Sequence, residues 1–169
     1  MASSISKARR VLADVRQVRE KLEDETGWIE WRLYWILAVT LLRAVGHVLD
    51  KVDGSESAKL RAVARRHYAR WKDCNAEEHA IFRDFIDQER NSILKEYEFG
   101  MSEGPIPIMA TLTNADANVS QIGALIEENV YRPMWSGPYE GEDGRTLIDE
   151  AIDWWVAQFD LIEEDVARL

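Results

Sequence analysis

Residues 80–100 read AIFRDFIDQERNSILKEYEFG and combine a helical apolar stripe with the densest group of polar residues in the chain. The apolar residues recur at spacings of three, four and seven, which places them on one buried side of a helix; they are Ile81, Phe82, Phe85, Ile86, Ile93 and Leu94. Arg90 interrupts this stripe, and Gly100 follows its aromatic end as a helix stop. We therefore predict a helix over about residues 76–98.

The polar residues of this helix carry a family resemblance. Arg90 and Asn91 are followed within two turns by Lys95, Glu96 and Tyr97. The stretch resembles the motif helix of HEPN domains, small antiparallel helical bundles whose functional motif is an Arg, often an Asn, and then a His. The histidine positions here hold Lys95, Glu96 and Tyr97. The resemblance implies a bundle fold and a dimeric habit, whereas the missing histidine removes the catalytic group of the family's metal-independent ribonucleases.

Two interpretations of Arg90 remain open. A guanidinium beside Asn91, with Lys95 farther along the helix, is suited to binding a phosphate. Alternatively, Arg90 forms a structural ion pair with Asp87 or with an acid on a neighbouring helix. If the site is catalytic, its candidates are Arg90, Asn91, Lys95 and Tyr97. RNA cleavage also needs a base, and lysine and tyrosine side chains usually keep their protons at neutral pH.

A second candidate site is a basic segment. The net charge of −10 argues against general affinity for nucleic acid. However, residues 59–72 contain six basic side chains and no acid. Its weak anion-binding candidates are Arg61, Arg65, Arg66 and Arg70, with Tyr68 and Trp71 as stacking groups. The alternative is that the acidic region at residues 140–165 neutralises this segment.

Apolar periodicity predicts further helices over about residues 4–24, 28–52, 55–72 and 146–169, with Ser55 capping the third. The helix over 28–52 is apolar around most of its circumference, so we predict that it is central or shared with a second subunit. Gly and Pro break the pattern between Gly100 and Gly144, around a short helix at about 116–130. The predicted fold is an all-α antiparallel bundle of four to five long helices, with an irregular excursion at about 100–144 packed over one side.

Composition predicts one domain spanning residues 1–169. The single cysteine, Cys74, excludes an intrachain disulfide and suits the reducing cytoplasm, where we expect the protein. The most apolar run, Leu33–Leu42, is about half the roughly 20 residues of a membrane span, so no membrane association is predicted. The histidines are isolated in sequence, and neither a metal site nor a cofactor is predicted; they are His47, His67 and His79.

These observations favour a non-catalytic helical interaction protein, an accessory to an RNA- or nucleotide-handling system. The alternative is a degenerate or unusual metal-independent ribonuclease of the HEPN type. We also predict a homodimer and consider a protein partner. Trp154 and Trp155 are adjacent and lie about 100° apart on a helix, so both cannot centre on one inward seam. One of them should meet the excursion or a second subunit.

Overall fold

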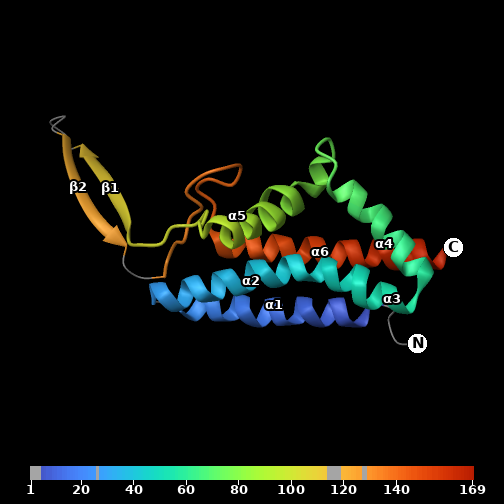
Figure 1. Cartoon of the computed structure of the whole chain (residues 1–169). Helices are drawn as coiled ribbons and strands as arrows, with labels where there is room; N and C mark the ends of the chain where they lie inside the picture. The colour runs from blue at the N-terminus through green and yellow to red at the C-terminus, as the bar shows by residue number, and fades with distance from the viewer. Residues whose placement is uncertain (1–4, 26, 114–118, 127–128) are drawn as a thin grey trace.

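The computed structural model describes residues 5–25, 27–113, 119–126 and 129–169. It is mostly helical, which confirms that part of the prediction, but it also contains a small two-stranded sheet. Three long helices lie side by side in Figure 1, with α1 antiparallel to α2 and α6; they are α1 (Ser6–Asp24), α2 (Trp28–Val48) and α6 (Gly144–Ala167). Each matches a predicted helix, although Ser4, where the first was expected to begin, lies outside the described residues.

Shorter helices form an arch over α2 and α6 (Figure 1). The rising side is α4, and the descending side begins after the turn at 72–76. The elements are η1 (Leu49–Asp53), α3 (Gly54–Glu56), α4 (Ala58–Trp71), η2 (Glu77–His79), η3 (Ile81–Asp87) and α5 (Gln88–Glu96). The predicted helix over 76–98 is therefore a succession of three helical types that diverges from α4 beyond the turn.

Two predicted helix ends are wrong. The helix expected to begin at Ser55 breaks at Ser57, whose backbone is extended and whose hydroxyl accepts a 3.2 Å hydrogen bond from Leu60 N. Ser57 therefore caps α4, whereas the Ser55 hydroxyl donates to the carbonyl of Val52. At the other end of the arch, α5 stops at Tyr97, which adopts a left-handed φ of 55°, and not at Gly100.

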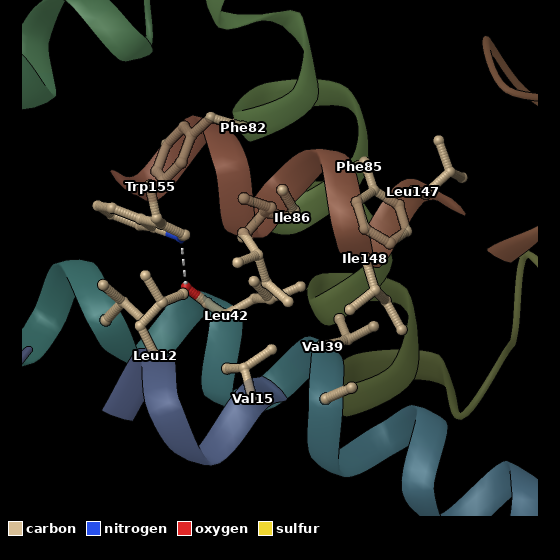
Figure 2. Packing of buried hydrophobic residues seen from close by; sticks show 14 of the residues in the cluster. Leu12, Val15, Val39, Leu42, Phe82, Phe85, Ile86, Leu147, Ile148 and Trp155 are labelled. Carbon is tan, nitrogen blue, oxygen red and sulfur yellow. Dashed lines mark hydrogen bonds between the residues drawn. The ribbon is translucent and has the colours of Figure 1, made fainter. Parts of the chain in front are cut away.

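Aromatic side chains fill the space beneath the arch. Trp155 is fully buried and donates from Nε1 to the carbonyl of Leu42 at 3.0 Å, as Figure 2 shows. Trp154 stacks on Phe82 of η3 and meets Trp71 of α4 at ring-centroid distances of 5.3 and 5.2 Å. Trp154 thus packs against the arch and is half-buried, so within the described residues its neighbours are the arch and not the excursion.

The segment from 100 to 143 has two parts, and the first packs on the bundle. Met101, Ser102, Arg132 and Met134 are buried. Backbone hydrogen bonds join the incoming and outgoing chains, from Ser102 N to the carbonyl of Pro133 at 2.8 Å and from Trp135 N to that of Gly100. This part agrees with the predicted packing over one side of the bundle.

The second part is an antiparallel hairpin of β1 (Ile106–Thr113) and β2 (Val119–Ile126), which projects from one end of the bundle (Figure 1). The predicted helix over 116–130 is therefore wrong where β2 replaces it, and the purely α class is wrong as well. Residues 116–118 and 127–128 of that predicted helix lie outside the described residues. The alternating apolar residues of β1 pair with β2, a contact that the helical spacing within 119–126 does not reveal.

One helical stretch among the described residues, Trp28–Glu56, is long and apolar enough to cross a membrane. A third of its most apolar window is buried inside the protein, and the core helix of a soluble protein passes the same test. Its Ile29, Leu33 and Leu37 are exposed. Within the described part of the chain, the side of α2 opposite the core is therefore an uncovered apolar surface.

A carboxylate lies inside the core where α5 faces α2. Glu89 is 6% exposed, and its Oε1 accepts hydrogen bonds from Trp35 Nε1 at 2.9 Å and Gly100 N at 3.0 Å. A Cβ on residue 100 would lie 2.6 Å from Glu89 Oε2, so close approach to this carboxylate, rather than a helix end, requires Gly100. Burial raises the pKa of Glu89, although the hydrogen bonds from Trp35 and Gly100 oppose that change.

Replacing Glu89 with Gln should reduce the pH dependence of stability. Because burial raises the pKa of Glu89 above its unfolded value of about 4.3, the folded state binds this proton more tightly. The favourable contribution is complete below the unfolded pKa and is lost as the pH rises through the folded pKa. Urea denaturation at about pH 5 and pH 8 should therefore show Glu89→Gln gaining stability relative to wild type at the higher pH. A constant difference would contradict this prediction.

Candidate anion-binding site

Arg90 does not form the structural ion pair that was considered for it. Its Nη1 donates to Asn91 Oδ1 at 2.9 Å, and no carboxylate of the described residues forms a salt bridge with it. Asp87 is instead held by Arg43 Nε at 2.8 Å and by Lys72 Nζ at 2.6 Å. Burial opposes the ionisation of Asp87, but hydrogen bonds from Lys72 and Arg43 outweigh it and lower its pKa. Within the described ranges, Arg90 therefore has no carboxylate partner.

Arg90 lies at a cavity between α2 and α5. This cavity, of about 350 Å³, is also lined by Thr40, Arg43, Ala44 and His47. Arg90 is half-buried, and its side chain lines this cavity. The arrangement gives an anion a donor group on a fixed helix.

A second cavity, of about 200 Å³, lies between α2 and α4. Its lining includes Arg43 and His47 again, together with Asp50, Arg65 and Tyr68. Because Arg43 and His47 line both cavities, the two cavities lie next to each other. We call the pair the basic groove and define it by Arg43, His47, Arg65, Tyr68 and Arg90.

Arg43 is the fixed centre of the basic groove. Its guanidinium lies 5.9 Å from the Tyr68 ring centroid and 5.7 Å from that of Phe82, while Nε is paired with Asp87. A 3.5 Å hydrogen bond from Nη2 to the Tyr68 hydroxyl adds a further restraint. The aromatic rings and Asp87 thus hold the guanidinium in place before any ligand arrives, which lowers the entropy cost of binding.

Arg65 forms the α4 wall of the groove. It is exposed, and its Nε pairs with Asp50 Oδ1 at 3.0 Å. Burial raises the pKa of Asp50, but hydrogen bonds from Lys51 and Arg65 outweigh this effect and lower the pKa overall. This carboxylate is therefore held in its charged form. Counted with Lys72, which holds Asp87, the groove and its edge carry more basic than acidic side chains.

The structure divides the predicted site residues. It brings Arg90 and Arg65 to one groove, although they come from two separate sequence predictions. Asn91 contacts Arg90, whereas Lys95 and Tyr97 line neither cavity. Lys95 is exposed, and the Tyr97 ring packs edge-on against Phe99 at 5.1 Å. The proposed catalytic set of four is therefore not assembled in one place.

The basic segment is also divided. Arg66 Nη2 pairs with Asp165 on α6 at 2.9 Å, as expected if the acidic C-terminal region neutralises the segment. Arg61 packs beside Gly54, and its buried Nε has no hydrogen-bond partner in the described part of the chain. Arg70 is exposed on α4. Arg65 lines the groove, whereas Arg66 and Arg61 have other neighbours, so the four arginines do not form a single site.

Sequence reasoning missed the contribution of α2. Arg43 and His47 lie four residues apart and share one helix face, but nothing in their spacing indicates that α4 and α5 approach that face. Tyr68 and Trp71, considered as stacking groups, both line the smaller cavity, but Trp71 is buried and only the Tyr68 ring is exposed. No group of three His, Cys, Asp or Glu side chains within the described ranges is arranged to hold a metal ion.

We compared the chain with protein-family models, with curated proteins and with solved structures. None of these comparisons finds a match.

Proposed function

We propose that this protein is a non-catalytic helical interaction protein that holds phosphate groups of an RNA strand or a nucleotide in the basic groove, as an accessory to an RNA- or nucleotide-handling system. The observation that carries the proposal is the position of Arg90. It has no carboxylate partner in the described residues and faces a cavity that it shares with Arg43 and His47. The HEPN-like character of residues 90–97 remains a resemblance that agrees with this proposal.

Phosphate is the anion that this groove suits best. A guanidinium offers paired N–H donors that match the oxygens of phosphate, and the groove has three such side chains on three helices. The exposed ring of Tyr68 supplies a surface on which a base can stack. A nucleotide or a short single-stranded segment satisfies both features, because it places phosphates and an unpaired base close together.

The overall charge limits the length of RNA that can bind. The net charge of −10 repels a polyanion at long range, whereas the basic groove attracts phosphate at short range. We therefore propose that the protein binds a few successive nucleotides and does not coat long nucleic acid. Its affinity should fall as salt rises, because bound phosphates release counterions.

His47 favours a second candidate function, a metal-independent ribonuclease. Its imidazole lines both cavities beside Arg43 and Arg90, although it lies on α2 and not in the motif helix. A neutral imidazole could accept the proton of a ribose hydroxyl, while Arg90 stabilised the charge that develops on phosphate. The acid beside it in the described groove, Asp50, is held in its charged form and cannot protonate the leaving oxygen, which is why we place binding first.

Two matched variants on α5 test the proposal. Fluorescence anisotropy with a labelled single-stranded RNA, in EDTA, should show Arg90→Gln binding about tenfold more weakly than wild type. Lys95→Gln removes the same charge from the same helix outside the groove, and its affinity should change less than about twofold. A mononucleotide competitor distinguishes recognition of a nucleotide from recognition of a strand.

Three outcomes would reject non-catalytic binding in the groove. Binding in the basic groove is rejected if no saturable RNA binding occurs, or if both variants lose affinity for RNA equally. Gel analysis of the same samples separates the ribonuclease: RNA that is cut by wild type and left intact by both Arg90→Gln and His47→Gln would establish catalysis in place of simple binding.

A further inference from the structure

The β-hairpin has one face made of apolar and small residues. In the antiparallel register, Ile108 lies opposite Ala124 and Ala110 lies opposite Ile122. Side chains of directly paired residues point to the same face of a hairpin. This face, which we call the hairpin face, comprises Ile108, Ala110, Leu112, Ile122 and Ala124 with Ser120 at its edge, and its three large residues are 43–54% exposed.

No other element in the described part of the chain covers the hairpin face. The two strands pack against each other and project away from the helices (Figure 1). A hairpin of two strands is marginally stable in water, and exposed edge strands are usually protected by charged residues. Residues 106–113 and 119–126 contain no charged residue. The hairpin therefore needs another surface to cover it.

A complementary apolar surface lies on α2. Ile29, Leu33 and Leu37 recur every four residues and are 44–62% exposed; we call them the α2 stripe. The same side of α2 continues through Thr40 and Ala44, which line the cavity beside Arg90. Like the hairpin face, the α2 stripe contains no charged residue.

We propose that the hairpin face of one copy packs on the α2 stripe of a second copy, in a twofold dimer whose arms are exchanged. Both surfaces occur on every chain, so a twofold arrangement covers both of them in both copies. The inference does not depend on phosphate binding at the basic groove. In this dimer the contacts are made by the hairpin face and the α2 stripe, and not by the tryptophans of α6.

The root of the hairpin supports this arrangement. Asn129 Nδ2 donates to the carbonyls of Leu22 and Glu23 at 2.9 and 3.0 Å, and the Arg132 guanidinium lies 3.3 Å from the Trp28 ring centroid. These contacts fix the outgoing strand to the turn between α1 and α2, beside the start of the α2 stripe. A twofold axis passing beside these roots would bring each arm to the start of the partner's α2 stripe.

The dimensions of the two surfaces also agree. Eight strand residues span about 26 Å, whereas α2 from Ile29 to Ala44 spans about 22 Å. A two-stranded ribbon about 10 Å wide has a footprint of roughly 260 Å². Two exchanged arms, counted on both contacting surfaces, would therefore bury on the order of 1,000 Å², about the area at which a biological interface begins.

Introducing charges on the two surfaces tests the proposal. Light scattering at tens of micromolar should give wild type a mass twice 19.5 kDa. Ile122→Lys on the hairpin face and Leu37→Glu on the α2 stripe should each halve that mass, because each buries an unpaired charge in both contacts. Circular dichroism should show both variants folded, since these side chains are exposed in the single chain. Met109→Lys, on the opposite hairpin face, should remain a dimer.

Mixing the two monomeric variants should restore the dimer. The mixed pair has one unaltered contact and one in which the introduced lysine of the first variant would face the introduced glutamate of the second, so neither charge is buried alone. Arm exchange is wrong if wild type is a monomer, if only one of the two variants dissociates, or if the mixture stays monomeric. Dissociation of the Ile122→Lys variant alone would indicate pairing between hairpins, and dissociation of the Leu37→Glu variant alone would indicate pairing between α2 helices.

Discussion

Trp155→Ala is expected to lower the free energy of unfolding by about 3–5 kcal/mol, the usual cost of deleting a large aromatic side chain from a core. Trp155 is fully buried, and its ring centroid lies 5.2 Å from that of Trp71 and 4.9 Å from that of Trp154. Truncation leaves a cavity where α2, α4 and α6 meet and removes the hydrogen bond to Leu42 (Figure 2). Urea denaturation monitored by circular dichroism measures the loss.

Trp135→Ala is the matched control for this substitution. Trp135 is 55% exposed on the excursion, so its removal should cost less than about 1 kcal/mol. Its backbone hydrogen bond to Gly100 does not depend on the side chain. If the two substitutions destabilised the protein equally, Trp155 would not be the centre of the core.

Arg132→Ala should cost about 2–4 kcal/mol, the second large effect on stability. Arg132 is fully buried, with its guanidinium against the Trp28 ring and Nε donating to Asn129 Oδ1 at 2.9 Å. Burial and the nearby charge of Arg145 lower the pKa of Arg132 to about 10, while Asp143 opposes that change. Burying the charged guanidinium therefore costs desolvation energy. Substitution by alanine removes the packing of this group on the Trp28 ring.

Arg132→Met separates packing from charge. Methionine keeps most of the volume against Trp28 without a buried charge, so this variant should lose less than about 1 kcal/mol. Limited proteolysis supplies a second readout, because loss of Arg132 should loosen the hairpin root and expose residues 100–143 to cleavage. Equal destabilisation by Met and Ala would show that the charge, and not packing, stabilises this position.

Local sequence patterns predicted the helices better than the excursion. The apolar spacing within α1, α2 and α6 depends on which side of each helix is buried, so each helix could be predicted from its own segment alone. The β-hairpin could not, because β2 also carries apolar residues at helical spacing and its strand character depends on pairing with β1. The prolines at 105 and 107 also led us to predict irregular chain where β1 begins, because proline is disfavoured within strands.

The candidate site was only partly predictable for a similar reason. Arg90 stood out because a charge interrupts an apolar stripe within its own helix. Its surroundings depend on packing between helices, since Arg43 and Lys72 take Asp87 and leave Arg90 without that acid. His47 was isolated in sequence and joins Arg90 through the approach of α5 to α2. Sequence spacing records neighbours on one helix, but not those that tertiary packing supplies.

The most direct test of phosphate binding is to observe the arginine side chains themselves. Nitrogen-15 NMR of the Nε–H groups, during titration of the full chain with inorganic pyrophosphate, reports contacts to each guanidinium. We predict that the signals of Arg43, Arg65 and Arg90 shift together and saturate, while exposed Arg168 at the end of α6 stays unchanged. Equal shifts at all four positions, or none in the groove, would contradict the account.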